Sequence, residues 1–109
     1  MRKSKTMSDY DDMVKLIIKR LRKRGFSQVS GYNRFRYMCE TEKAIILLRE
    51  KGTEARIPLA KIAAAIEAVR QEPAIYDKGP SALRKYGITH INSPLWSLLN
   101  LLSKAELML

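Results

Sequence analysis

Residues 44–48 constrain the fold more than any other stretch, because five apolar residues in succession lie between Lys43 and Arg49. Two of the five are β-branched, and the run is far too short to cross a membrane. It is apolar at both alternating positions. This is typical of a strand covered on both faces, or of the middle strand of a small sheet with one helix-covered face. We therefore expect a sheet built around these residues.

Two further strands are expected beside this run. Residues 34–39 alternate between two faces, and residues 54–57 follow a turn as a short strand. The simplest connection of three consecutive strands is an antiparallel meander. On the strand at residues 34–39, the side chains expected to face the core are Phe35, Tyr37 and Cys39, and those expected on the other side are Arg34, Arg36 and Met38. Cys39, the only cysteine, is therefore interpreted as a small buried hydrophobic residue.

Helical periodicity appears on both sides of the predicted sheet. Residues 8–24 place apolar residues at helical spacing, with Ser8 as the expected N-cap. Pro58 is expected to open a second long helix, and residues 79–86 and 93–102 a C-terminal helical pair. The prediction is an α+β fold with a three-stranded antiparallel meander. A basic amphipathic helix precedes the meander, and the second long helix and the helical pair follow it.

The chain of 109 residues is long enough for one domain. We expect a disordered basic arm over residues 1–7 and a single domain over residues 8–109. The net charge of +10 is unevenly distributed, since residues 1–36 contain 11 basic and 3 acidic side chains, whereas residues 37–109 contain 10 and 8. This asymmetry favours one surface that faces a polyanion.

The first candidate site is a basic ridge on the N-terminal helix, opposite its apolar stripe. Several cations in a line are suited to binding successive phosphates, and they give affinity without reading the base sequence. Arg34 and Arg36, on the outward side of their strand, are expected to extend the site. The residues of the ridge are Lys15, Lys19, Arg22 and Lys23. The alternative interpretation is that the ridge is only the solvated back of a helix.

The second candidate site is a helix-turn-helix within residues 80–102, with the turn at Gly87. In that motif the start of the second helix offers side chains to the major groove of DNA. The alternative is a helical hairpin that closes the core, with Trp96 buried as its anchor. The groove-contacting residues under the first interpretation are Thr89, His90, Asn92 and Ser93.

The order helix, three strands, helix over residues 9–71 is similar to that of double-stranded-RNA-binding domains. The similarity concerns topology alone. Those domains have a cluster of lysines at the start of their last helix, whereas this chain has only Lys61 there. We expect both long helices to pack on one face of the sheet, and the resemblance implies duplex RNA as a partner.

The sequence shows no catalytic, metal or cofactor signature. His90 is the only histidine and Cys39 the only thiol, so the ligand pairs of a zinc site are missing. Neither a glycine-rich phosphate loop nor a dinucleotide motif is present. We therefore expect a non-enzymatic protein without metal or cofactor. The basic start is followed by polar residues rather than an apolar segment, which favours a cytoplasmic location.

These observations favour a small nucleic-acid-binding protein that contacts phosphates, with double-stranded DNA preferred to RNA as the partner. One alternative is a protein–protein module, such as the small subunit of a mobile-element or restriction system, that dimerises through an apolar C-terminal helix. A second alternative, membrane binding by the N-terminal helix, is disfavoured because the sheet needs the apolar stripe of that helix as a cover. The residues expected in the homodimer contact are Leu95, Trp96, Leu99 and Leu102.

Overall fold

The computed structural model describes the backbone of residues 5–108 and the side chains of residues 10–108. In this range the protein is a mixed α+β structure in which helices precede and follow a four-stranded antiparallel sheet. The elements in chain order are α1 (Lys5–Arg24), β1 (Phe26–Ser27), β2 (Phe35–Glu40), β3 (Ala44–Arg49), β4 (Glu54–Pro58), α2 (Leu59–Gln71), α3 (Ile75–Lys78), the 3-10 helix η1 (Pro80–Tyr86), α4 (Asn92–Leu99) and α5 (Lys104–Leu107).

The four strands lie in the order β1-β2-β3-β4, so the apolar run forms an interior strand, as expected. The sequence predicted three strands, and the additional one is β1. Its two residues pair with the start of β2, Phe26 opposite Arg36 and Ser27 opposite Phe35. A strand of two residues is too short for alternation to be visible in the sequence, which explains the miscount.

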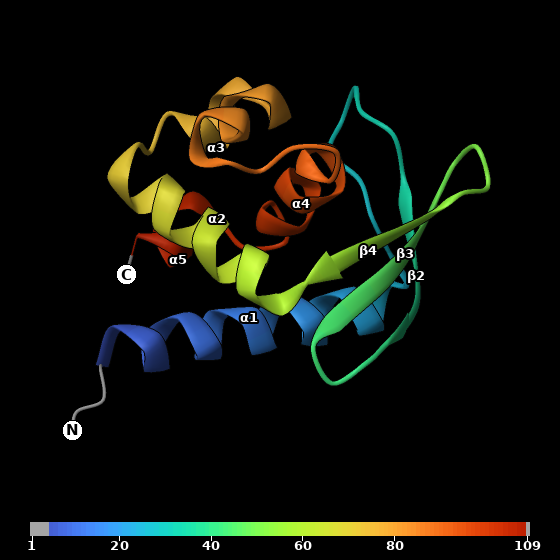
Figure 1. Ribbon diagram of the computed structural model, residues 1–109, viewed down its shortest axis with the longest axis horizontal. Coiled ribbons are helices and arrows are strands. Elements are labelled where there is room, and N and C mark those ends of the chain that lie inside the picture. Colours follow the sequence, from blue (N-terminus) through green and yellow to red (C-terminus); the bar gives the residue numbers. More distant parts are fainter. Residues whose placement is uncertain (1–4, 109) are drawn as a thin grey trace.

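The helices cover one face of the sheet and leave the other open. Figure 1 shows the labelled helices on one side of the sheet. The side chains that point to that side are fully buried, Ile45 and Leu47 on β3 and Ile57 on β4. The next residues along the same strands include Ile46, which is half-buried, and Arg56, which is exposed. The structure therefore matches the second interpretation of the apolar run, a middle strand with one helix-covered face.

Cys39 is exposed, so its expected burial is wrong. The cause is a β-bulge in β2. Tyr37 pairs with Leu47, and Cys39, two residues further along β2, pairs with Ile46, which is the direct neighbour of Leu47 on β3. Met38 is the extra residue, and its side chain is 46% exposed. Since an extra residue exchanges the two faces of a strand, the bulge turns Cys39 away from the core.

Several helix boundaries differ from those expected. α1 already includes residues 5–7 of the predicted arm, and residues 1–4 lie outside the described residues. Ser8 is therefore inside the helix and is not its N-cap. Pro58 ends β4 and is itself the N-cap of α2. α4 begins at Asn92, so Ser93 does not cap it.

The C-terminal segments form much of the core. Seven of the eight residues of α4 are buried, and the indole Nε1 of Trp96 donates a hydrogen bond of 3.0 Å to the carbonyl of Ile75. The apolar face that the homodimer alternative needs on the surface is therefore inside the chain. The four residues assigned to a homodimer contact are among the buried core residues, which are Leu95, Trp96, Leu99 and Leu102.

The short helix α5 also holds α1 in place. The guanidinium of Arg20 donates hydrogen bonds of 2.8 and 2.7 Å to the two carboxylate oxygens of Glu106 and one of 2.7 Å to the carbonyl of Leu101. Glu106 also closes a capping box with Ser103 at the start of α5. The hydrogen bonds from Arg20, followed by that from the Ser103 backbone, lower the pKa of Glu106 to about 2. Among the helices of the described residues, none combines the length and apolar character needed to cross a membrane.

Candidate nucleic-acid interface

The basic ridge lies along the exposed side of α1, as the sequence predicts. α1 buries Val14, Ile17 and Leu21 against the rest of the molecule. Gly25 then ends the helix, because its φ of +81° is a left-handed conformation that favours glycine. The four ridge side chains are exposed, namely Lys15, Lys19, Arg22 and Lys23.

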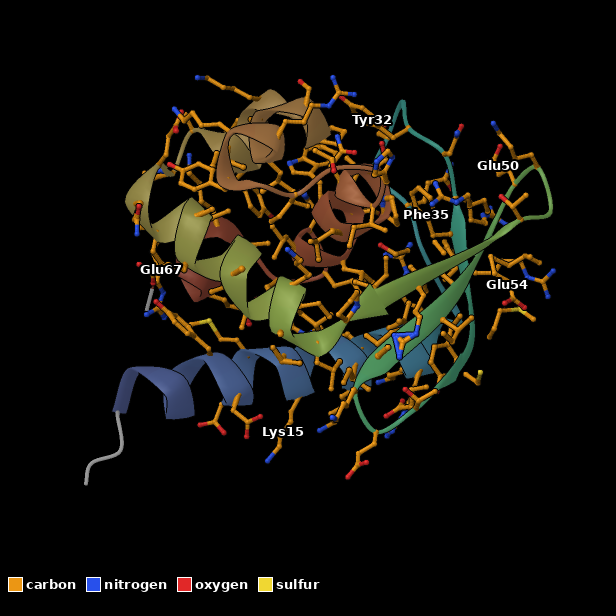
Figure 2. All side chains as sticks on the ribbon, in the orientation of Figure 1. Lys15, Tyr32, Phe35, Glu50, Glu54 and Glu67 are labelled. Carbon is orange, nitrogen blue, oxygen red and sulfur yellow. The ribbon has the colours of Figure 1, made fainter. Side chains whose placement is uncertain are left out.

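Two of these four cations already have a carboxylate partner. Lys15 lies 3.2 Å from Asp11 one helical turn earlier, but both side chains are more than half exposed, so this pair is weak. Figure 2 shows Lys15 pointing away from the body of the molecule.

Arg22 has a structural role. Its guanidinium binds both carboxylate oxygens of Glu40, with N–O distances of 2.9 and 2.7 Å, and the hydroxyl of Tyr37 donates a further bond of 2.9 Å to Glu40. The hydrogen bond that Arg22 donates to Glu40 raises the pKa of Arg22, and desolvation raises the pKa of Tyr37. A phosphate would have to compete with Glu40 for Arg22. This arrangement ties α1 to the end of β2.

Cations also gather around Phe26, just beyond the end of α1. The guanidinium carbon atoms of Arg24 and Arg34 lie 4.5 and 4.6 Å from the centroid of its ring. Arg36 is the partner of Phe26 across the β1–β2 pair. We call Arg24, Phe26, Arg34 and Arg36 the arginine–phenylalanine cluster. It brings together residues from α1, β1, the β1–β2 loop and β2.

The charges of this cluster are available to a ligand. The backbone N–H of Arg34 donates to Glu50 at 2.7 Å and its Nε to the amide oxygen of Gln28 at 3.4 Å, but neither contact is an ion pair of its side chain. Within the described side chains, no carboxylate pairs with the three arginines of the cluster or with Lys19 and Lys23. These five exposed cations form the strongest anion-binding candidate.

The predicted helix-turn-helix is wrong. A recognition helix must be exposed to enter the major groove, whereas Ser93 alone among the residues of α4 is not buried. Asn92 is 7% exposed, and its side-chain amide donates a bond of 3.1 Å to the carbonyl of Pro80. Thr89 and His90 are exposed, but they lie in the connection before α4 and not on a free helix. The alternative, a helical hairpin that closes the core around Trp96, matches the structure.

Ser93 lies instead at a polar hollow between the sheet and α4. Two adjoining hollows of about 440 and 160 Å³ share Asn33, Phe35 and Ser93 in their walls. Nearby, a guanidinium nitrogen of Arg49 lies 3.5 Å from the carbonyl of His90, at the limit of a hydrogen bond. These contacts connect β3 to the segment before α4.

The sequence missed the cluster because β1 was not predicted. Arg24 was not among the predicted ridge residues, and Phe26 was given no role in binding. The available signal was Phe26 directly after the helix-ending Gly25, with Arg34-Phe35-Arg36 as a following strand. Pairing those two segments places Phe26 opposite Arg36.

Comparison of the chain with models of known families, with curated proteins and with solved structures gave no match. The functional argument therefore depends on the residues and geometry described above.

Proposed function

We propose that this protein binds nucleic acid, without catalysing a reaction, through phosphate contacts made by the end of α1 and the adjoining strands. The observation that supports this proposal best is the group of five exposed cations without a carboxylate partner in the described part of the chain, which are Lys19, Lys23, Arg24, Arg34 and Arg36.

Electrostatics explains why such a group suits a polyanion. Arg24 and Arg34 share the ring of Phe26, so two positive charges are held close to each other. Phosphates placed between like charges relieve their repulsion and release condensed counterions into solution. The net charge of +10 would strengthen the attraction at low ionic strength.

The test is a salt titration of binding to a mixed-sequence DNA duplex, followed by fluorescence anisotropy. Each phosphate contact contributes about −0.9 to the slope of log K against log salt concentration. We expect replacement of all five cations by glutamine to flatten the slope by about 4.5 and to leave thermal unfolding unchanged. The absence of any salt-dependent binding by the unmodified protein to DNA or RNA would overturn the proposal.

A matched control removes charge elsewhere on the surface. Lys61 on α2 is exposed, and Lys78 makes a long ion pair of 3.4 Å with Glu72, which also binds Lys85 at 2.7 Å. The double variant Lys61→Gln, Lys78→Gln should bind with an almost unaltered slope. An equal effect of control and test variants, charge for charge, would mean that binding depends on net charge and not on this surface.

A further inference from the structure

We infer that the open face of the sheet binds an unpaired nucleic-acid strand, with bases stacked on the arginine–phenylalanine cluster and on the apolar residues of β3. This inference rests on the proposed function and specifies its ligand. It begins from the division of the sheet into two faces. Figure 2 shows Phe35 on the side of the helices and Glu54 on the opposite side.

The open face combines planar, apolar and cationic groups. The register places Leu48 between Arg36 and Glu54, and Ile46 between Cys39 and Arg56. Two half-buried apolar side chains therefore lie on the diagonal between two exposed arginines. Phe26 extends this surface on the other side of Arg36. Directly across β3 from Arg36 is Glu54, and Arg56 lies diagonally, two residues further along β4, so the two arginines are roughly 12 Å apart. This spacing leaves room for a flat group between the two charges.

The charge on this face favours an anion. The open face has Arg36 and Arg56 on the strands and the guanidinium groups of Arg24 and Arg34 on Phe26. Among the residues of β1 to β4 that point to this side, Glu54 is the acidic one, at the start of β4 beside Leu48. A protein partner would have to be strongly acidic as well as apolar to match this surface, whereas a nucleic-acid strand supplies both phosphates and flat apolar faces.

The apolar part of the face distinguishes single strands from duplexes. In a duplex the flat faces of the bases are stacked on one another, so phosphates and groove edges are what the protein can contact. A single strand exposes its base faces, which stack on aromatic rings and on guanidinium planes. Ile46, Leu48 and the guanidinium planes held on Phe26 gain contacts from such exposed bases. The same surface should therefore bind an unpaired strand more tightly than a duplex of equal length.

The experiment compares three labelled probes of one mixed sequence of about 20 nucleotides, longer than the roughly 4–16 nucleotides that one small domain covers. The probes are single-stranded DNA, single-stranded RNA and the DNA duplex. Tighter binding of either single strand than of the duplex supports the inference, and the ratio of the two single strands identifies the preferred sugar. Tighter binding of the duplex overturns it and leaves the proposed function standing.

The deciding variant keeps the charges and removes the planes. Arg24→Lys, Arg34→Lys and Arg36→Lys together retain three cations but lose the flat guanidinium groups. We expect about fivefold or greater weakening for single strands, no change for the duplex and an unchanged salt slope. Arg84→Lys, an exposed site on η1, is the matched control. Single-strand affinity equal to that of the unmodified protein would overturn the inference.

Two further outcomes are separable. No binding to any probe removes the proposed function and the inference together. If light scattering instead shows a dimer that Ile46→Lys and Leu48→Lys dissolve, the open face is an interface between two copies, and the inference is overturned. Circular dichroism of each variant verifies that the fold is retained before binding is compared.

Discussion

Arg24, at the end of α1, has different surroundings from Arg20 and Arg22 on the same helix. The difference separates two regions of the molecule. Arg20 and Arg22 bind the carboxylates of Glu106 and Glu40 through two guanidinium nitrogens each. Arg24, one turn beyond Arg20, lies on the ring of Phe26 without such a partner in the described part of the chain. The density of positive charge in a sequence therefore does not reveal which cations are available. Availability depends on where the distant acidic residues lie after folding.

The same contrast holds between α4 and the end of α1, both of which the sequence offered as contacts for nucleic acid. α4 is enclosed by the core, whereas the end of α1 and the adjoining strands present exposed cations. Variants in the enclosed region should change stability and leave affinity alone. Variants in the exposed region should do the opposite. The predictions below test this division, beginning with the largest effect.

Trp96→Ala should lower the free energy of unfolding by about 3–5 kcal/mol, because a large buried side chain is lost together with its hydrogen bond to Ile75. Denaturant unfolding followed by far-ultraviolet circular dichroism measures the loss. The folded fraction should bind DNA with unchanged affinity. A loss below about 1 kcal/mol together with weakened binding would restore α4 as a recognition helix.

Arg22→Gln and Lys23→Gln form a pair of neighbouring variants with identical charge change. Arg22→Gln should lower the melting temperature, by less than Trp96→Ala does, because it leaves Glu40 without its ion pair. Lys23→Gln should leave melting unchanged and reduce the salt slope of DNA binding by about 0.9. Thermal unfolding of both variants measures the change in melting temperature, and fluorescence anisotropy measures the change in salt slope. Equal slope changes without a difference in melting would show that Arg22 is as free as Lys23.

The Arg20–Glu106 pair predicts a dependence of stability on pH. The pKa of Glu106 is lowered to about 2 in the folded protein from an ordinary value of 4.5. A lowered pKa means that the folded state holds the charged form more firmly than the unfolded state does. The contribution is therefore present above the unfolded pKa of 4.5, and it is lost as the pH falls through this value towards 2.

Glu106→Gln isolates this charge effect, since glutamine also suits its position in the capping box. The variant should be less stable than the unmodified protein at neutral pH. The difference between the two denaturant midpoints should shrink between pH 5 and pH 2. If the two midpoints fall in parallel over this range, Glu106 contributes no charge-dependent stability.

The sequence was sufficient where the controlling signal is local. Residues 44–48 indicated the interior strand because five consecutive apolar side chains need cover. Gly87 was expected to form the turn after the short helix at residues 79–86, and its φ of +79° shows why a residue without a side chain stands there. The mixed helix and sheet fold follows from such short-range patterns.

The candidate site could be predicted only in part, because tertiary partners decide it. The sequence placed the exposed cations of α1 correctly, but the pairing of Arg22 with Glu40 joins residues 18 positions apart. The grouping of Arg24 and Arg34 on Phe26 requires β1, which is too short to show a pattern. Neither arrangement is encoded in a local spacing. Only the structure therefore distinguishes the cations that have a carboxylate partner from those that are available to a ligand.

The β-bulge in β2 gives the smallest expected effect. Because Met38 is inserted opposite β3, Cys39 lies on the open face beside Ile46 and is exposed. The folded protein should therefore react with Ellman's reagent about as fast as the unfolded chain does, and Cys39→Ser should change the unfolding free energy by no more than about 0.5 kcal/mol. Strong protection of the thiol in native protein would mean that the strand runs without the bulge. Cys39 would then face the core, and the arginine–phenylalanine cluster, which lies before the bulge on the same strand, would keep its position.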